Sequence, residues 1–317
     1  MNTVTAIAGI VVKELYRRKD FYVLFVLTAL ITLLLGTVNF FNDPKIVRYL
    51  KEVCLLLIWV SSLVIAIGTA ARQIPAEREN RTIFPLLAKP VTRGQVIVGK
   101  FLGCWLACGM ALVVFYLFFG VVSESRTHKD STSPETSSVA AAHDHDQDHA
   151  PAAPAKSDAP ETVPVAPDHD HDHDPATCKD ASHNAKTSVV TNYFQAFWLH
   201  WLALGVVTAL VLLGSVVLSA PSVAATISFI AVVGILLLGE HLNKVAVQQP
   251  QPMQAILYTG YFLIPHLEWF DIRDRIIYDH PPVAFVDCGL ATLYAAAYTG
   301  LFLFLAWWVF RRKTLTL

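Results

Sequence analysis

Residues 72–100 read RQIPAERENRTIFPLLAKPVTRGQVIVGK and form a basic run between two strongly apolar segments. Cationic side chains outnumber acidic ones in it: Arg72, Arg78, Arg81, Lys89, Arg93 and Lys100 against Glu77 and Glu79. The positive-inside rule retains a short basic connection of this kind in the cytoplasm. The run therefore predicts a cytoplasmic loop, and its position sets the orientation of the remaining segments.

The composition is typical of an integral membrane protein. Of the 317 residues, 54% are hydrophobic and only 15% are charged, whereas about 25% of a soluble domain is charged. The net charge of −1 gives no reason to expect a nucleic-acid partner. Five cysteines match no disulfide framework, and the positive charges of the N-terminus follow its apolar part, the reverse of a cleavable signal.

Six apolar segments approach the roughly 20 residues that cross a bilayer. They cover about 21–41, 52–71, 99–122, 200–218, 223–238 and 284–310, with a short segment between the first two that ends at Lys51. With the basic loop inside, six crossings place both termini in the cytoplasm. The predicted fold class is an all-α integral membrane protein with six transmembrane helices.

The segments around these spans complete the predicted organisation. Residues 1–20 carry apolar side chains at helical spacing with a basic end, typical of an amphipathic surface helix. Residues 21–123 hold three spans with the cytoplasmic coupling loop 72–98, and residues 189–310 hold three more with an outer segment 240–283. Residues 124–188 form an extracytoplasmic insertion, and 311–317 a basic cytoplasmic tail.

The basic loop contains signals for two helices. Pro75 suits the first turn of a helix, and Glu77 and Glu79 suit its positive end. Pro85 and Pro90 interrupt that helix because proline lacks an amide donor. A second helix, capped by Thr92, is then predicted to run into the third span.

These residues resemble those of a known family. The pattern is Glu77, Glu79, Arg81-Thr82, Leu86-Leu87, Lys89-Pro90, Arg93, Gly99-Lys100 and Gly103. It is similar to the cytoplasmic loop of type-2 ABC exporter permeases. The run Ile264–Asp274, IPHLEWFDIRD, resembles the subgroup that includes the permease for copper-site maturation of nitrous oxide reductase. The resemblance covers most of the chain except the insertion.

The resemblance implies a transport subunit of the bacterial inner membrane that is not itself an enzyme. Its loop would dock on a separate cytoplasmic ATPase, which binds the ATP and Mg²⁺, and a second permease copy or homologue would complete the transporter. This chain would bind no cofactor of its own. The residues expected to couple to the ATPase are Pro75, Glu77, Arg78, Glu79, Arg81, Thr82, Lys89, Pro90 and Arg93.

The insertion at 124–188 is rich in Ala, Pro, Ser, Asp and His and almost lacks large apolar residues, so we expect disorder. Six histidines alternate with aspartates in two clusters: His143, His145 and His149, then His169, His171 and His173. Imidazole and carboxylate groups at this density suit a loose site for a divalent ion such as zinc, nickel or copper. A solvated spacer without metal is the alternative.

Small residues recur on one face of the third span, where Gly99, Gly103 and Ala107 permit close approach of another helix. Cys104 and Cys108 share a spacing of four residues, and packing is preferred over a metal pair for them. Gly94–Lys100 fits G-x-x-x-x-G-K, but Phe101 replaces the magnesium-binding Ser or Thr and no strand precedes it. A phosphate-binding loop is therefore rejected.

Few polar groups remain near the spans. His200 and Asp287 are predicted to lie near outer ends and to reach the interface, where an aromatic belt that includes Trp198 and Trp201 is also expected. Glu240, His241, His266 and Glu268 are candidates to line an outer exit vestibule.

Three functions are weighed. The first is the permease subunit of an ATP-driven exporter. The second is a metal-cation transporter or metal-binding membrane protein that uses the His/Asp-rich loop, and the third is a non-transporting membrane scaffold. A cation transporter needs His/Asp pairs one turn apart within spans, and no span has one. Capture of an ATPase partner separates the permease from the scaffold.

Overall fold

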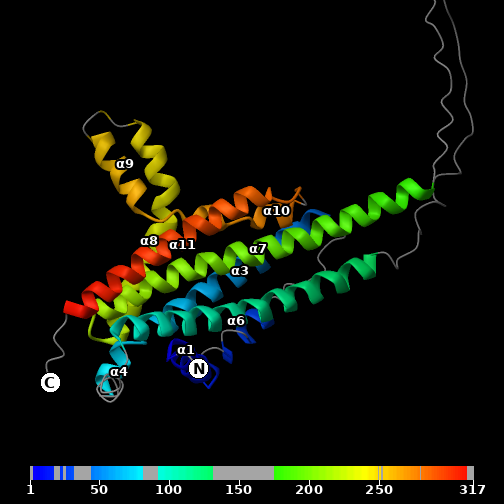
Figure 1. The fold of residues 1–317 in the computed structure, drawn as a ribbon. Helices are drawn as coiled ribbons and strands as arrows, with labels where there is room; N and C mark the ends of the chain where they lie inside the picture. Colours follow the sequence, from blue (N-terminus) through cyan, green and yellow to red (C-terminus); the bar gives the residue numbers. More distant parts are fainter. Residues whose placement is uncertain are drawn as a thin grey trace, which may run out of the picture.

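The computed structural model describes residues 3–17, 22–23, 26–31, 44–80, 92–130, 175–248, 250, 253–278 and 280–312. Within these ranges the regular structure is helical throughout. The helices are α1 (Thr3–Tyr16), α3 (Pro44–Ala70), α4 (Pro75–Glu79), α6 (Arg93–Asp130), α7 (Pro175–Val217), α8 (Pro221–Gln248), α9 (Met253–Leu263), the 3-10 turn η1 (Leu267–Phe270), α10 (Arg273–Ile277) and α11 (Phe285–Arg312) (Figure 1). The predicted all-α fold class is therefore confirmed for the described residues.

Four helices of the described chain are long and apolar enough to cross a membrane. They are Lys51–Glu79, Arg93–Val121, Val189–Val217 and Phe285–Arg312. The predicted first span, 21–41, lies largely outside the described residues, and the predicted fifth corresponds to the shorter apolar stretch Pro221–Leu237. Six crossings therefore remain a prediction.

Two predicted boundaries were wrong. No break separates a short segment from the second span, because α3 runs unbroken from Pro44. Helices also enter both edges of the insertion expected to be disordered, since α6 continues to Asp130 and α7 begins at Pro175. Extending an existing helix avoids the cost of a new nucleus, so a stable span can carry polar residues with it. Residues 131–174, with the six clustered histidines, lie outside the described part.

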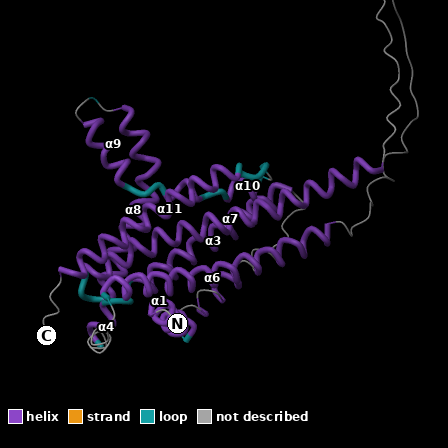
Figure 2. Tube along the Cα trace, in the orientation of Figure 1, coloured by secondary structure: helices purple, strands orange, loops and turns teal. Residues whose placement is uncertain are grey.

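The helix α7 forms the centre of the bundle. In the most apolar stretch of each span, 72% of the α7 residues and 61% of the α3 residues are buried, against 6% of the α11 residues. Figure 2 shows α3, α6, α7 and α11 running along one common direction, while the α8–α9 hairpin diverges from them. The helix α11 thus lies at the periphery of the bundle, with most of its surface not covered by the described protein.

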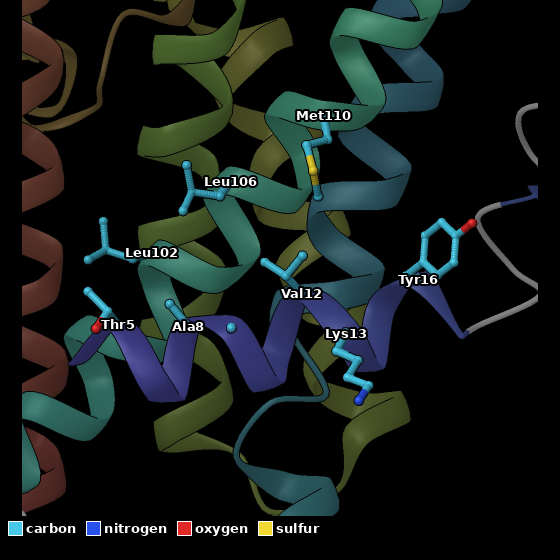
Figure 3. Close-up of a pocket in the computed structure, with 9 residues that line it drawn as sticks. Thr5, Ala8, Val12, Lys13, Tyr16, Leu102, Leu106 and Met110 are labelled. Carbon is cyan, nitrogen blue, oxygen red and sulfur yellow. The ribbon is translucent and has the colours of Figure 1, made fainter. Parts of the chain in front are cut away.

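The helix α1 lies across α6 rather than along it (Figure 3). Its buried side is short and apolar, with Ile7, Ala8 and Val11, while Ile10 and Tyr16 are exposed. Thr5, Val12 and Lys13 border an apolar groove whose opposite wall is Leu102, Leu106 and Met110 of α6. The burial of α1 is therefore one-sided, and its placement on a membrane surface stays a prediction.

Candidate functional site

The helix α4 begins where the sequence predicted, at Pro75. Proline at the first position needs no amide partner, and Glu77 lies in the first turn. A continuous set of turns joins α4 to α3, because the amides of Gln73 and Ala76 donate to the carbonyls of Ala70 and Arg72. The short helix therefore stands directly on the end of a span.

An ion pair fixes α4 to α6. The Nζ atom of Lys100 lies 2.6 Å from Oε1 of Glu77 and donates a second bond of 2.9 Å to the carbonyl of Gln73. The Lys100 side chain is 3% exposed and that of Glu77 is 32% exposed. A buried ammonium without partners is strongly destabilising, so the position of Lys100 depends on both acceptors.

The sequence analysis missed this role of Lys100. The basic run, the family-like pattern and the phosphate-loop motif all included Lys100, but none of them gave it an acceptor, and it lies within α6, where its side chain reaches back to α4. A signal was present, because a single lysine inside an otherwise apolar span needs an acceptor nearby. The preceding loop, with Glu77, was the nearest source.

Two arginines of the basic run bind the C-terminal ends of other helices. Arg93 donates two 3.0 Å bonds to the carbonyls of Phe310 and Arg311 in the last turn of α11. Arg78 approaches the carbonyl of Val216, near the end of α7, at 3.5 Å, the outer limit for a hydrogen bond. Both cations lie where the helix dipole is negative and carbonyls lack helical partners.

The predicted cap at Thr92 is present and is reciprocal. The Gln95 amide donates to the Thr92 hydroxyl at 3.3 Å, and the Thr92 amide donates to Oε1 of Gln95 at 3.1 Å. This capping box fixes the start of α6 and hence the position of the adjacent Arg93.

A small apolar cluster lies beneath these polar contacts. Its fully buried members come from the turn before α4 and from α6, α7 and α11: Ile74, Ile97, Phe101, Ala209, Leu212, Val216, Ala306 and Phe310. One junction therefore joins α3, α4, α6, α7 and α11. We call it the α4 junction.

The structure brings together part of the predicted coupling set. Pro75, Glu77, Arg78 and Arg93 belong to the α4 junction, whereas Glu79 is exposed on α4. The remaining predicted coupling residues lie outside the described residues: Arg81, Thr82, Lys89 and Pro90.

Gly99 and Gly103 on α6 face α1. A Cβ atom at Gly99 would lie 2.9 Å from Cβ of Ile7, and one at Gly103 would lie 2.6 Å from Cβ of Val11. Both distances are too short for side-chain contacts, so the two glycines allow α1 to reach the α6 backbone. Ala107, the third predicted packing residue, packs against the main core.

His200 does not reach the interface as predicted. It is 3% exposed, its Nε2 atom lies 2.7 Å from the Ser62 hydroxyl of α3, and its ring stacks 5.8 Å from that of Trp59. Of the expected aromatic belt, Trp201 is half-buried and stacks on Trp105 at 4.5 Å, whereas Phe194 is exposed. Packing of α7 against α3 buries the His200 ring, and each indole N–H of the Trp pair donates to the other residue's carbonyl.

A second polar assembly lies at the end of the bundle remote from α4, where η1 and α10 cover α3 and α7 (Figure 1). The side chain of Gln195 exchanges two 2.9 Å bonds with the backbone of Val283, and Asn192 donates to the carbonyl of His280 at 2.8 Å. Arg273 pairs with Asp271 at 2.7 Å and lies 5.9 Å from the Trp59 ring. We call residues 264–284 the outer cap.

His266 opens the outer cap and is 7% exposed. Its backbone amide donates to the Tyr294 hydroxyl at 2.9 Å, and its Nδ1 atom lies 3.0 Å from the same oxygen. Burial lowers the pKa of the imidazole below its ordinary value of 6.5, against an opposing effect of Glu268. The ring is therefore neutral at pH 7.

Metal-ligating side chains are dispersed in the part of the chain that the structure describes. No group of three or more His, Cys, Asp or Glu side chains there is placed to hold an ion. Cys104 and Cys108 are buried free thiols within the core. The six clustered histidines lie outside the described ranges.

A family model matches the N-terminal part of the chain. Residues 5–143 match the model of the ABC-2 family transporter protein, a range that covers α1, α3, α4 and α6. No curated protein matches the chain. The matched range includes most of the α4 junction and ends before the outer cap, so it does not test the resemblance to the copper-maturation subgroup. Together with the four candidate spans, the match supports a multi-pass membrane permease of the ABC-2 type.

Proposed function

We propose that this chain is the transmembrane permease subunit of an ATP-driven ABC exporter. In this proposal a separate cytoplasmic ATPase docks on α4 and drives the spans between inward-facing and outward-facing states. The observation that carries the proposal is the ion pair between Glu77 and Lys100, which joins α4 to the candidate spanning helix α6.

The orientation follows from the charges at the α4 junction. Arg72, Arg78, Arg93, Arg311 and Arg312 gather at this end of the bundle, since Arg93 binds the last turn of α11. Clustered arginines next to span ends favour the cytoplasmic side. Six crossings with both termini in the cytoplasm, in the inner membrane, agree with that placement.

The α4 junction supports a direct mechanical path. A displacement of α4 moves the Glu77 carboxylate and the Gln73 carbonyl, and the buried Lys100 follows because losing both acceptors would strand its charge. Arg93, seven residues before Lys100 on the same helix, holds the end of α11. Movement of α6 is thus transmitted to α11, while Arg78 contacts the end of α7.

A second permease copy or homologue is part of the proposal. The outer face of α11 exposes large apolar side chains along its length, among them Phe285, Leu293 and Phe304. Such a face suits lipid or a second spanning subunit. We infer that the transporter contains two permease subunits and two ATPases. We also infer that the outer cap faces the exported cargo, because it carries the resemblance to the copper-maturation subgroup.

The test is co-purification and stimulated ATP hydrolysis with the ATPase encoded in a neighbouring reading frame. Glu79→Lys reverses an exposed charge on α4, so it should weaken capture of the ATPase while leaving the bundle folded. Asp287→Asn, exposed at the other end, is the matched control. Equal capture and stimulation by wild type and Glu79→Lys would contradict docking at α4, and failure of any ATPase to bind wild type would favour the scaffold.

A further inference from the structure

Two polar atoms of the outer cap are buried without a hydrogen-bond partner among the described residues. They are Nε2 of His266 and Oε1 of Glu268, which belong to side chains two residues apart at the start of η1. Buried polar atoms in folded proteins are nearly always satisfied. An imidazole nitrogen and a carboxylate oxygen two residues apart are therefore both available to a ligand.

The other edge of the His266 ring is firmly held. Its Nδ1 atom lies 3.0 Å from the Tyr294 hydroxyl, and the ring meets the edge of Tyr261 at a centroid distance of 4.1 Å. The ring of Trp269 lies 5.7 Å from the His266 ring, centroid to centroid. Leu267, between the two unsatisfied residues, is 2% exposed and anchors the segment in the core. The direction of Nε2 is therefore fixed by packing.

This arrangement has the features of a metal ligand. An imidazole that binds a metal through one nitrogen almost always has its other nitrogen hydrogen-bonded, which sets the tautomer and the ring orientation. The Tyr294 oxygen can accept from both the His266 amide and Nδ1–H, which leaves the lone pair on Nε2. The Glu268 carboxylate then supplies an oxygen donor of opposite charge to the ion.

We propose that Nε2 of His266 and the carboxylate of Glu268 are the protein ligands of a site for a divalent transition-metal ion of the zinc class. Nitrogen and carboxylate oxygen are the donors that such ions accept, commonly in four-coordinate geometry. Two protein ligands leave positions for water or for donor groups on a cargo or partner. The site is thus open, and neither of its protein ligands belongs to the clustered histidines of the insertion.

The test uses the full-length chain in lipid nanodiscs, without an ATPase. Serine replaces the clustered histidines, so that the insertion cannot bind the probe: His143, His145, His149, His169, His171 and His173. Zn²⁺ alone is titrated in competition with a chromophoric chelator. We expect one Zn²⁺ per chain, with affinity at least tenfold lower in both His266→Ala and Glu268→Gln. His280→Ala, which removes an exposed imidazole of the same cap, should leave binding unchanged.

A second variant separates ligation from folding. Tyr294→Phe keeps the ring but removes the hydroxyl that positions Nδ1, and loss of such a partner typically weakens metal binding about 10–100-fold. Thermal unfolding of each variant without metal reports its fold, and Glu268→Gln remains informative if His266→Ala fails to fold. The proposal would be overturned if His266→Ala and Glu268→Gln bound Zn²⁺ as tightly as the serine-substituted parent. It would also be overturned if that parent bound no stoichiometric Zn²⁺. Because no ATPase is present, neither result bears on the permease function.

Discussion

The ammonium group of Lys100 lies 2.6 Å from the carboxylate of Glu77, although 23 residues separate them and one belongs to a spanning helix while the other belongs to α4. This pair makes Glu77→Lys a poor probe of coupling, because it would place two ammonium groups together at a buried site. Glu79 is exposed, so its substitution tests docking without disturbing this pair.

Removal of one member of the pair should destabilise the bundle. Glu77→Ala is expected to lower the free energy of unfolding by about 1–3 kcal/mol, less than for a fully buried pair because Glu77 is 32% exposed. Glu77→Ala combined with Lys100→Met should recover most of that loss, since no charge is then left unpaired. Thermal unfolding in detergent measures both, and a double variant as unstable as the single one would show that the pair is not the cause.

Filling the contact between α1 and α6 should displace α1. A Cβ at Gly103 would approach Cβ of Val11 to 2.6 Å, so Gly103→Ala is expected to cost about 1–3 kcal/mol of stability. Gly120→Ala on the same helix meets open space and is the matched control. Protease cleavage near residue 17 reports release of α1. Unchanged cleavage and stability in Gly103→Ala would contradict the packing described.

The hydrogen bond between Ser62 and His200 should stabilise the pairing of α3 with α7. Ser62→Ala removes it and is expected to cost about 0.6 kcal/mol, the average for such bonds within membranes, and at most about 1.7 kcal/mol. Ser215→Ala, which loses only a bond within its own helix, serves for comparison. Equal unfolding temperatures for the two variants would argue that the interhelical bond contributes nothing.

Deletion of residues 131–174, with a short Gly/Ser linker in their place, should leave membrane insertion and ATPase stimulation intact. The described ends of α6 and α7 flank this segment, and α3, α6, α7 and α11 pack without it. Expression level and ATP hydrolysis with the partner are the measurements. Loss of expression would instead assign the insertion a structural role.

Local signals predicted the local features well. The start of α4 at Pro75 and the cap at Thr92 each depend on a few neighbouring residues, and both are confirmed. The inward position of His200 depends on the packing of α7 against α3, which no local pattern encodes. Lys100 combines both situations. The sequence showed that a lysine within an apolar span needs an acceptor, but only the structure identified that acceptor as Glu77.

The outer cap shows the same limit. Its prolines predicted interruption of the helix, but the paired bonds of Gln195 with Val283 join residues 88 positions apart. The unsatisfied atoms of His266 and Glu268 become visible only once Tyr294 and Leu267 are placed around them.

The central claim is that α4 faces the cytoplasm and receives the ATPase. Its most direct test is labelling of Glu79→Cys by a membrane-impermeant maleimide. Cys178 and Cys288 are replaced by serine so that they do not react. Cys54, Cys104 and Cys108 are buried and can be kept. The account predicts that the cysteine is labelled in inside-out membrane vesicles and is not labelled in cells whose outer envelope has been removed but whose inner membrane is intact. Added ATPase should protect the cysteine from labelling in the vesicles. Labelling from the outside of intact cells, or labelling that the ATPase leaves unchanged, would contradict it.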